Sequence, residues 1–131
     1  MPARSSSKLN VIVVDDNPAV LNSLKFSLEI EGLSVSCYHS GTELLGASES
    51  LKSGCMVIDY HLFDMNGLEL LRKLRDRSIS IPVLLITSYP SAALRKQAVD
   101  AHVQIVEKPL FGNRLLDAIR GALAGQAAAR S

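Results

Sequence analysis

Residues 9–18 read LNVIVVDDNP, and this stretch decides the fold class. The run from Leu9 to Val14 is apolar and β-branched along almost its whole length. A strand that is apolar on both faces suits a sheet covered by helices on both sides, which is typical of parallel sheets. Two aspartates end the run, Asn17 then offers a helix N-cap, and Pro18 suits a first helical turn. The stretch therefore predicts a buried strand followed at once by a helix.

The same strand–helix order returns along the chain. The predicted strands are Leu9–Val14, Leu33–Tyr38, Cys55–Ile58, Pro82–Ile86 and Val103–Val106. The predicted helices run from Pro18 to about Glu31, from Ser40 to about Leu51, from Gly67 to Arg77, from Ser91 to about Asp100, and along a stripe from Leu115 to Leu123. Such alternation predicts an α/β fold, a doubly wound (βα)5 three-layer sandwich around a parallel five-stranded sheet.

The chain has 131 residues, a length typical of one domain. We expect a flexible tail at residues 1–7, a folded domain over 8–124 and a second flexible tail at 125–131, because both ends are rich in polar or small residues. Hydrophobic residues make up 47% and the net charge is +1. This composition is that of a globular domain without a general attraction to nucleic acid or anionic lipid.

Apolar runs stay far short of the roughly 20 residues that a membrane-spanning helix needs, and no secretion signal is visible. Cys37 and Cys55 lie far apart in apolar stretches, which is typical of buried thiols in a reducing compartment. We therefore expect a cytoplasmic protein that makes no membrane contact.

Polar side chains follow four of the predicted strands at the point where each strand ends. Asp15 and Asp16 follow the first strand, Asp59 the third, Thr87 the fourth and Lys108 the fifth. Because parallel strands present their carboxyl ends at one edge of the sheet, we expect these groups to meet there.

Three carboxylates in one place need a cation or shifted pKa values, since two of them about 4 Å apart repel by about 4 kcal/mol at an effective dielectric of 20. Lys108 supplies one positive charge, and Mg²⁺, which binds few carboxylates and keeps several waters, would supply the rest. A carboxylate beside Mg²⁺, an ammonium and a hydroxyl is suited to attack a phosphoryl group. Asp59 is the nucleophile candidate, because it ends the central strand and stands alone.

The chain resembles the receiver domain of bacterial two-component response regulators over about residues 8–123. The residues that carry the resemblance are the acidic pair Asp15-Asp16, the strand end Val57-Ile58-Asp59, Met65 and Gly67 after it, Thr87-Ser88, and Lys108-Pro109. The resemblance implies a flavodoxin-like sheet with the strand order 2-1-3-4-5 that chemotaxis receivers also have.

The resemblance also implies roles for the residues at the sheet edge. Asp59 takes the phosphoryl group, Lys108 and Thr87 contact it, and Ser88 is the small residue beside Thr87.

For the metal, the resemblance implies that Mg²⁺ binds Asp16, Asp59 and the backbone carbonyl of His61, with Asp15 helping through water. The side chains of His61 and Tyr89, two residues beyond Asp59 and Thr87, are expected either to flank the phosphoryl group and tune its lifetime or to be exposed loop residues without a role.

The chain departs from the family pattern at three positions. Phe63 stands where the family usually has proline, and Ala101 stands where a glycine usually ends the fourth helix, so that this turn is expected to have a different shape. Ile105 stands at the switch position, where the family usually carries tyrosine or phenylalanine. The phosphorylation chemistry does not need that aromatic ring, but the usual readout through it is in doubt.

The expected function is a phosphoacceptor switch rather than an enzyme, since the domain would catalyse only its own phosphorylation and dephosphorylation. The expected partners are a sensor histidine kinase or a phosphotransfer protein and a downstream protein target, without direct nucleic-acid binding, and the expected state is a monomer or a weak homodimer.

Two alternative functions stay open. One is a receiver-like scaffold that works without phosphorylation, which Ile105 favours. The other is an Asp-nucleophile phosphatase, which the histidine at position 61 opposes because a second acid is usual there.

Overall fold

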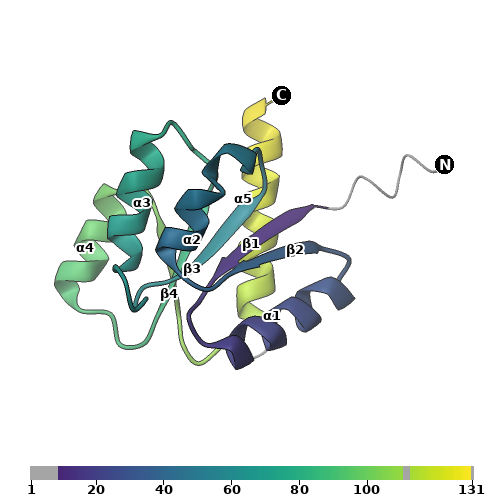
Figure 1. The fold of residues 1–131 in the computed structure, drawn as a ribbon, viewed down its shortest axis with the longest axis horizontal. Coiled ribbons are helices and arrows are strands. Elements are labelled where there is room, and N and C mark those ends of the chain that lie inside the picture. The colour runs from purple at the N-terminus through teal and green to yellow at the C-terminus, as the bar shows by residue number, and fades with distance from the viewer. Residues whose placement is uncertain (1–8, 111–112, 131) are drawn as a thin grey trace.

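A computed structural model describes residues 9–110 and 113–130 (Figure 1). Its strands are β1 (Asn10–Val14), β2 (Ser34–Tyr38), β3 (Cys55–Asp59), β4 (Val83–Thr87) and β5 (Gln104–Glu107). Its helices are α1 (Pro18–Ile30), α2 (Gly41–Gly46), α3 (Gly67–Asp76), α4 (Ala92–Asp100) and α5 (Arg114–Arg130), with a 3-10 turn, η2 (Ser48–Ser50), after α2. No helix in these described ranges is long and apolar enough to cross a membrane.

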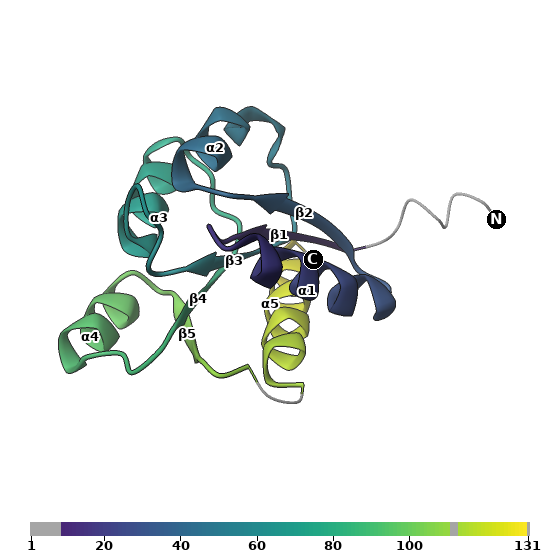
Figure 2. The same cartoon turned by 60° about the horizontal axis from the view of Figure 1, so that its bottom comes forward.

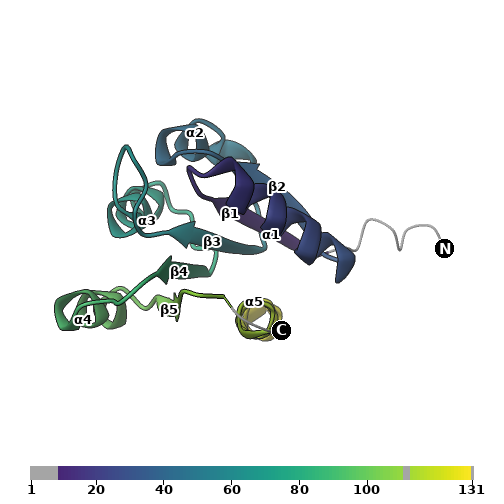
Figure 3. The ribbon, with the colours of Figure 1, turned by 90° about the horizontal axis from the view of Figure 1, so that it is seen from below.

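The strands form one parallel sheet in the order β2-β1-β3-β4-β5. The predicted doubly wound fold and its strand order are therefore confirmed. Helices α2, α3 and α4 cover one face of the sheet, while α1 and α5 cover the other (Figures 2 and 3). This arrangement places the carboxyl ends of all the strands at a single edge.

The first strand shows why the sheet needs helices on both sides. Val11 and Val13 pack into the core beneath α1 and α5, whereas Ile12 and Val14 pack into the core beneath α2, α3 and α4. All four side chains are at most 1% exposed. Alternate side chains of a strand point to opposite faces, so a continuous apolar run feeds both cores at once.

Two predicted helix ends are wrong. The second helix was predicted to reach about Leu51, but α2 ends at Gly46 and the chain passes through a 3-10 turn, because glycine is a poor helix former. The fifth helix was predicted to give way to a loose tail from Gly125, but α5 continues to Arg130. Alanine dominates this segment, and its high helix propensity outweighs the glycine. The predicted tail at residues 1–7 lies outside the described residues.

The turn at the end of α4 contains Ala101 and His102. Ala101 keeps a negative φ of −90°, and the left-handed residue is His102, with φ 57°. A histidine adopts this conformation at higher cost than glycine.

The cysteines differ from each other in burial. Cys55 lies on central strand β3, and burial raises the pKa of its thiol to about 12. Cys37 was predicted to be buried but is half-buried, because β2 is an edge strand. Both thiols are free.

Gly67 opens α3 at a point where the backbone approaches the sheet closely. A Cβ at this position would clash with Leu85 Cδ1 and would lie 3.1 Å from the Cα of Tyr60. We expect Gly67→Ala to lower the free energy of unfolding by about 1–3 kcal/mol, as overpacking does. Gly121→Ala is the control, because nothing lies within 4 Å of a Cβ there, and it should raise stability by about 0.5–1 kcal/mol. Urea unfolding measures both, and equal stability of Gly67→Ala and wild type would contradict the packing.

Candidate functional site

The polar residues predicted at the strand ends do lie at one edge of the sheet. Asp59 and Thr87 are the last residues of β3 and β4, while Asp15 and Lys108 come directly after β1 and β5. Val14 pairs with Ile58 in the parallel register of β1 and β3, so that the next residues, Asp15 and Asp59, are neighbours. Paired strands lie about 4.8 Å apart, which forces the two carboxylates together.

Asp59 is held by contacts to both of its carboxylate oxygens. Lys108 donates from Nζ to Oδ2 over 3.1 Å, across 49 residues of chain, and the backbone N–H of His61 donates to Oδ1 over 2.9 Å. Asp59 is 7% exposed, so its carboxylate is largely shielded from water, whereas the Lys108 side chain is 34% exposed. Lys108 itself is tied to the sheet, since its N–H donates to the carbonyl of Thr87 over 2.8 Å, and its peptide bond to Pro109 is cis.

Asp15 is the second buried carboxylate, at 5% exposure. Burial raises the pKa of Asp15, and the facing carboxylate of Asp59 raises it further. The N–H of Asn17, which donates to Oδ1 over 2.9 Å, and the charge of Lys108 offset part of that rise. Two acids and one ammonium therefore share this edge, and their charges do not balance when both acids are ionised.

The third predicted carboxylate, Asp16, is exposed. Within residues 9–110 and 113–130 no three His, Cys, Asp or Glu side chains form a group that could hold a metal ion. The structure thus brings Asp15, Asp59 and Lys108 together and leaves Asp16 exposed. The oxygens of Asp15 and Asp59 are hard donors and could hold a hard divalent cation together with water.

The loop after β4 carries the remaining predicted residues. Thr87 is buried, and its hydroxyl lies 3.5 Å from the carbonyl of Ser88. Ser88 is exposed, and Tyr89 is 95% exposed with a left-handed φ of 47°. A non-glycine residue in that region is uncommon, so the loop is held in a strained shape close to the site.

His61 and Ile105 differ in how they face the site. His61 is exposed, its ring stands edge-on to Tyr60 at a centroid distance of 4.8 Å, and its amide contacts Asp59. Ile105 is half-buried and packs against the core beneath α2, α3 and α4. Phe63 is 76% exposed.

One polar contact near the site was not predicted from the sequence. Asp64, in the loop after β3, accepts hydrogen bonds from the backbone of Gly41 and from the backbone and hydroxyl of Thr42, at the start of α2. Partial burial raises the pKa of Asp64, but the bonds from Thr42 and Gly41 outweigh that effect and lower it. No local motif signals this contact, because its partners lie 22 and 23 residues away in the chain.

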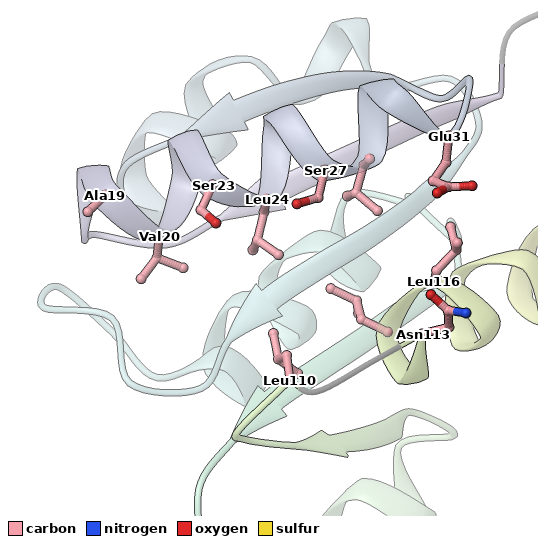
Figure 4. A pocket seen from close by; sticks show the side chains of 11 residues that line it. Ala19, Val20, Ser23, Leu24, Ser27, Glu31, Leu110, Asn113 and Leu116 are labelled. Atoms are coloured by element: carbon pink, nitrogen blue, oxygen red, sulfur yellow. The ribbon is translucent and has the colours of Figure 1, made fainter.

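A groove lies elsewhere on the molecule, away from these strand ends. It has a volume of about 440 Å³ and runs between α1 and α5 (Figure 4). Leu24 and Leu28 line one wall, and Leu110, Leu115 and Leu116 line the other. None of the charged groups at the strand ends is among the described residues along its walls.

The crowding of Asp15 and Asp59 predicts that one of these carboxylates destabilises the metal-free fold. Asp15→Asn removes a charge but keeps an oxygen that can accept the N–H of Asn17. We expect it to raise the free energy of unfolding in metal-free buffer by about 1 kcal/mol. Asp76→Asn, at an exposed position on α3, should stay within about 0.5 kcal/mol of wild type. Urea unfolding with a chelator present tests this, and a less stable Asp15→Asn would show that no repulsion exists.

The fold agrees with comparisons to known proteins. Transcriptional regulatory protein FixJ of Rhizobium meliloti is 34% identical over 113 residues, which cover 86% of this chain and 55% of the relative. Transcriptional regulatory protein TdiR of Thauera aromatica is 32% identical over 122 residues, covering 92% and 54%. The chain thus spans about half the length of these curated relatives.

Solved structures of receiver domains have the same fold as this chain. A crystal structure of FixJ-N superposes with a TM-score of 0.82 at 32% identity, covering 90% of this chain and 95% of that one. A CheY-like receiver domain protein from Methanospirillum hungatei superposes with a TM-score of 0.85 at 29% identity, covering 93% and 98%. The family profile described as response regulator receiver domain matches residues 11–120. On the profile, the fold and the grouped strand-end residues together, this chain belongs to the receiver domains of two-component response regulators.

Proposed function

We propose that Asp59 accepts a phosphoryl group and that the domain thereby works as a switch. The observation that carries this proposal is the contact of Lys108 Nζ with the buried carboxylate of Asp59, at 3.1 Å from Oδ2. Receiver domains of response regulators are signalling switches, and a phosphoacceptor role fits that class. The donor is a phosphohistidine on a sensor histidine kinase or a phosphotransfer protein.

The reaction is an exchange of one bond for another at phosphorus. A carboxylate oxygen of Asp59 forms the new P–O bond as the P–N bond of the phosphohistidine breaks, and the imidazole leaves with the electron pair and takes up a proton from water. Lys108 already contacts the carboxylate, so that its charge is in place to stabilise the negative charge on the transferring oxygens.

Mg²⁺ fits the donor set of two buried carboxylates, since this ion usually takes one or two carboxylates and keeps its waters. Asp15, Asp16, Asp59 and the backbone carbonyl of His61 would hold it. When bound, the ion adds positive charge at the phosphoryl oxygens. It would also compensate the carboxylate charge that Lys108 alone leaves unbalanced.

The switch follows from the charge that the phosphoryl group brings, about −1.5 to −2, and from its acceptor oxygens. New bonds to Lys108 and to the hydroxyl of Thr87 contribute roughly 1.5–3 kcal/mol each when charge-assisted. A shift from 1:99 to 99:1 needs about 5.5 kcal/mol of differential interaction. Two such bonds can supply this, but Ile105 has no ring to couple the movement of Thr87 to the surface, so we expect a partial shift.

The partners belong to the same proposal. We expect the domain to act in the cytoplasm and to pass the signal by protein contact rather than by binding nucleic acid itself. A scaffold that works without phosphorylation is the second candidate, and the half-buried isoleucine at the switch position favours it.

Acetyl phosphate with Mg²⁺ tests the proposal without a kinase. We expect intact-mass spectrometry to find one added phosphoryl group on the wild type and on Asp76→Asn, and none on Asp59→Asn. Peptide mapping should place the group on Asp59. Folded wild-type protein that stays unlabelled would favour the scaffold.

The exposed rings of His61 and Tyr89 are proposed to slow the attack of water on the phosphoryl group. We expect His61→Gly and Tyr89→Gly each to shorten the half-life of the labelled protein, because bulk that impedes water is removed. The decay is followed by intact mass after the acetyl phosphate is removed. Unchanged half-lives in both variants would assign these side chains no role in the lifetime.

A further inference from the structure

The loop that joins β3 to α3 has two parts. Residues 60–61 and 66–67 pair with each other and form its stem, and residues 62–65 form its tip. In the stem, the N–H of Gly67 donates to the carbonyl of Tyr60 over 2.8 Å, and His61 pairs with Asn66 as an antiparallel bridge. The N–H of Tyr60 donates to the carbonyl of Ile86, which ties the same stem to β4. The stem therefore carries His61 in a defined position beside Asp59.

The tip of the loop is held from outside the site by α2. Asp64 Oδ2 accepts from the hydroxyl of Thr42 over 2.6 Å and from its N–H over 2.9 Å, while Oδ1 accepts from the N–H of Gly41 over 3.2 Å. Bonds to an ionised carboxylate are stronger than bonds between neutral groups. Both carboxylate oxygens of Asp64 thus accept hydrogen bonds from the first residues of α2, a segment that is remote in sequence.

Packing at the tip reinforces this contact. The side chain of Met65 lies against Gly41 so closely that a Cβ on that glycine would stand 2.7 Å from Met65 Sδ. Leu62, on the other limb of the tip, is 8% exposed and belongs to the core beneath α2, α3 and α4. Met65 and the carboxylate of Asp64 therefore seat the loop on α2, while Leu62 anchors it in the core.

We propose that Asp64, through Thr42 and Gly41, is a positioning residue that sets the orientation of the His61 peptide at the phosphoacceptor site. This inference rests on the proposed function, in which the carbonyl of that peptide is a ligand of Mg²⁺. Asp64 touches neither the cation nor the phosphoryl group. It acts by fixing the tip, so that the stem presents His61 to Asp59 in one geometry rather than in several.

The test measures the affinity of the full chain for Mg²⁺ alone, by titration calorimetry, at a temperature where every variant is folded by circular dichroism. Residues that orient metal ligands typically change metal affinity by about tenfold to a hundredfold when they are removed. Because Asp64 acts from a greater distance, we expect Asp64→Ala to raise the Kd for Mg²⁺ by about tenfold, the lower end of that range.

Thr42 supplies a milder variant and its matched rescue. Thr42→Val keeps the shape of the side chain but removes the hydroxyl that donates to Asp64, so we expect a smaller rise in Kd. Thr42→Ser keeps the hydroxyl and should bind Mg²⁺ as the wild type does. Asp76→Asn controls for the loss of one negative charge at a distance from the site, and should also match the wild type.

The outcomes separate this inference from the proposed function. If the wild type binds Mg²⁺ and both Asp64→Ala and Thr42→Val bind it equally well, the positioning role is wrong and the proposed function stands. If Asp64→Ala does not fold, Thr42→Val against Thr42→Ser decides the question by the same criterion. If the wild type itself does not bind Mg²⁺, the proposed function fails and this inference fails with it.

Discussion

The parallel pairing of β1 with β3 forces two buried carboxylates, Asp15 and Asp59, against each other, and the rest of the site depends on that constraint. Lys108 follows the edge strand β5, which β4 separates from β3, and its ammonium contacts Asp59. Its single charge offsets one carboxylate and leaves the other in a poorly solvated place. A site of this kind gains stability from any added positive charge, which is why a divalent cation suits it.

Most of the fold could be predicted because a single pattern, a doubly apolar strand followed by an amphipathic helix, repeats along the chain. The strand-end residues Asp59 and Lys108 could be placed together on the same basis, since topology alone brings the carboxyl ends of parallel strands to one edge. The ends of α2 and α5 were less predictable. There a single glycine competes with neighbouring helix formers, and the sum of small propensities decides the outcome.

The loop after β3 shows what sequence patterns do not contain. The bond from Thr42 to Asp64 joins two segments that share no periodicity or spacing motif, so only the folded chain reveals it. The exposure of Asp16 next to the buried Asp15 is likewise not encoded by an Asp-Asp pair. The proposed output also depends on such local geometry, because Ile105 already packs inward and has no ring with which to report the movement of Thr87.

A crystal structure grown with Mg²⁺ and beryllofluoride, a mimic of an acyl-linked phosphoryl group, tests the central claim most directly. The account predicts beryllium bonded to a carboxylate oxygen of Asp59, with Lys108 Nζ and Thr87 Oγ1 on its fluorines and a cation beside Asp15. Crystals of folded protein with no adduct at Asp59, or with Lys108 turned away from it, would contradict the account.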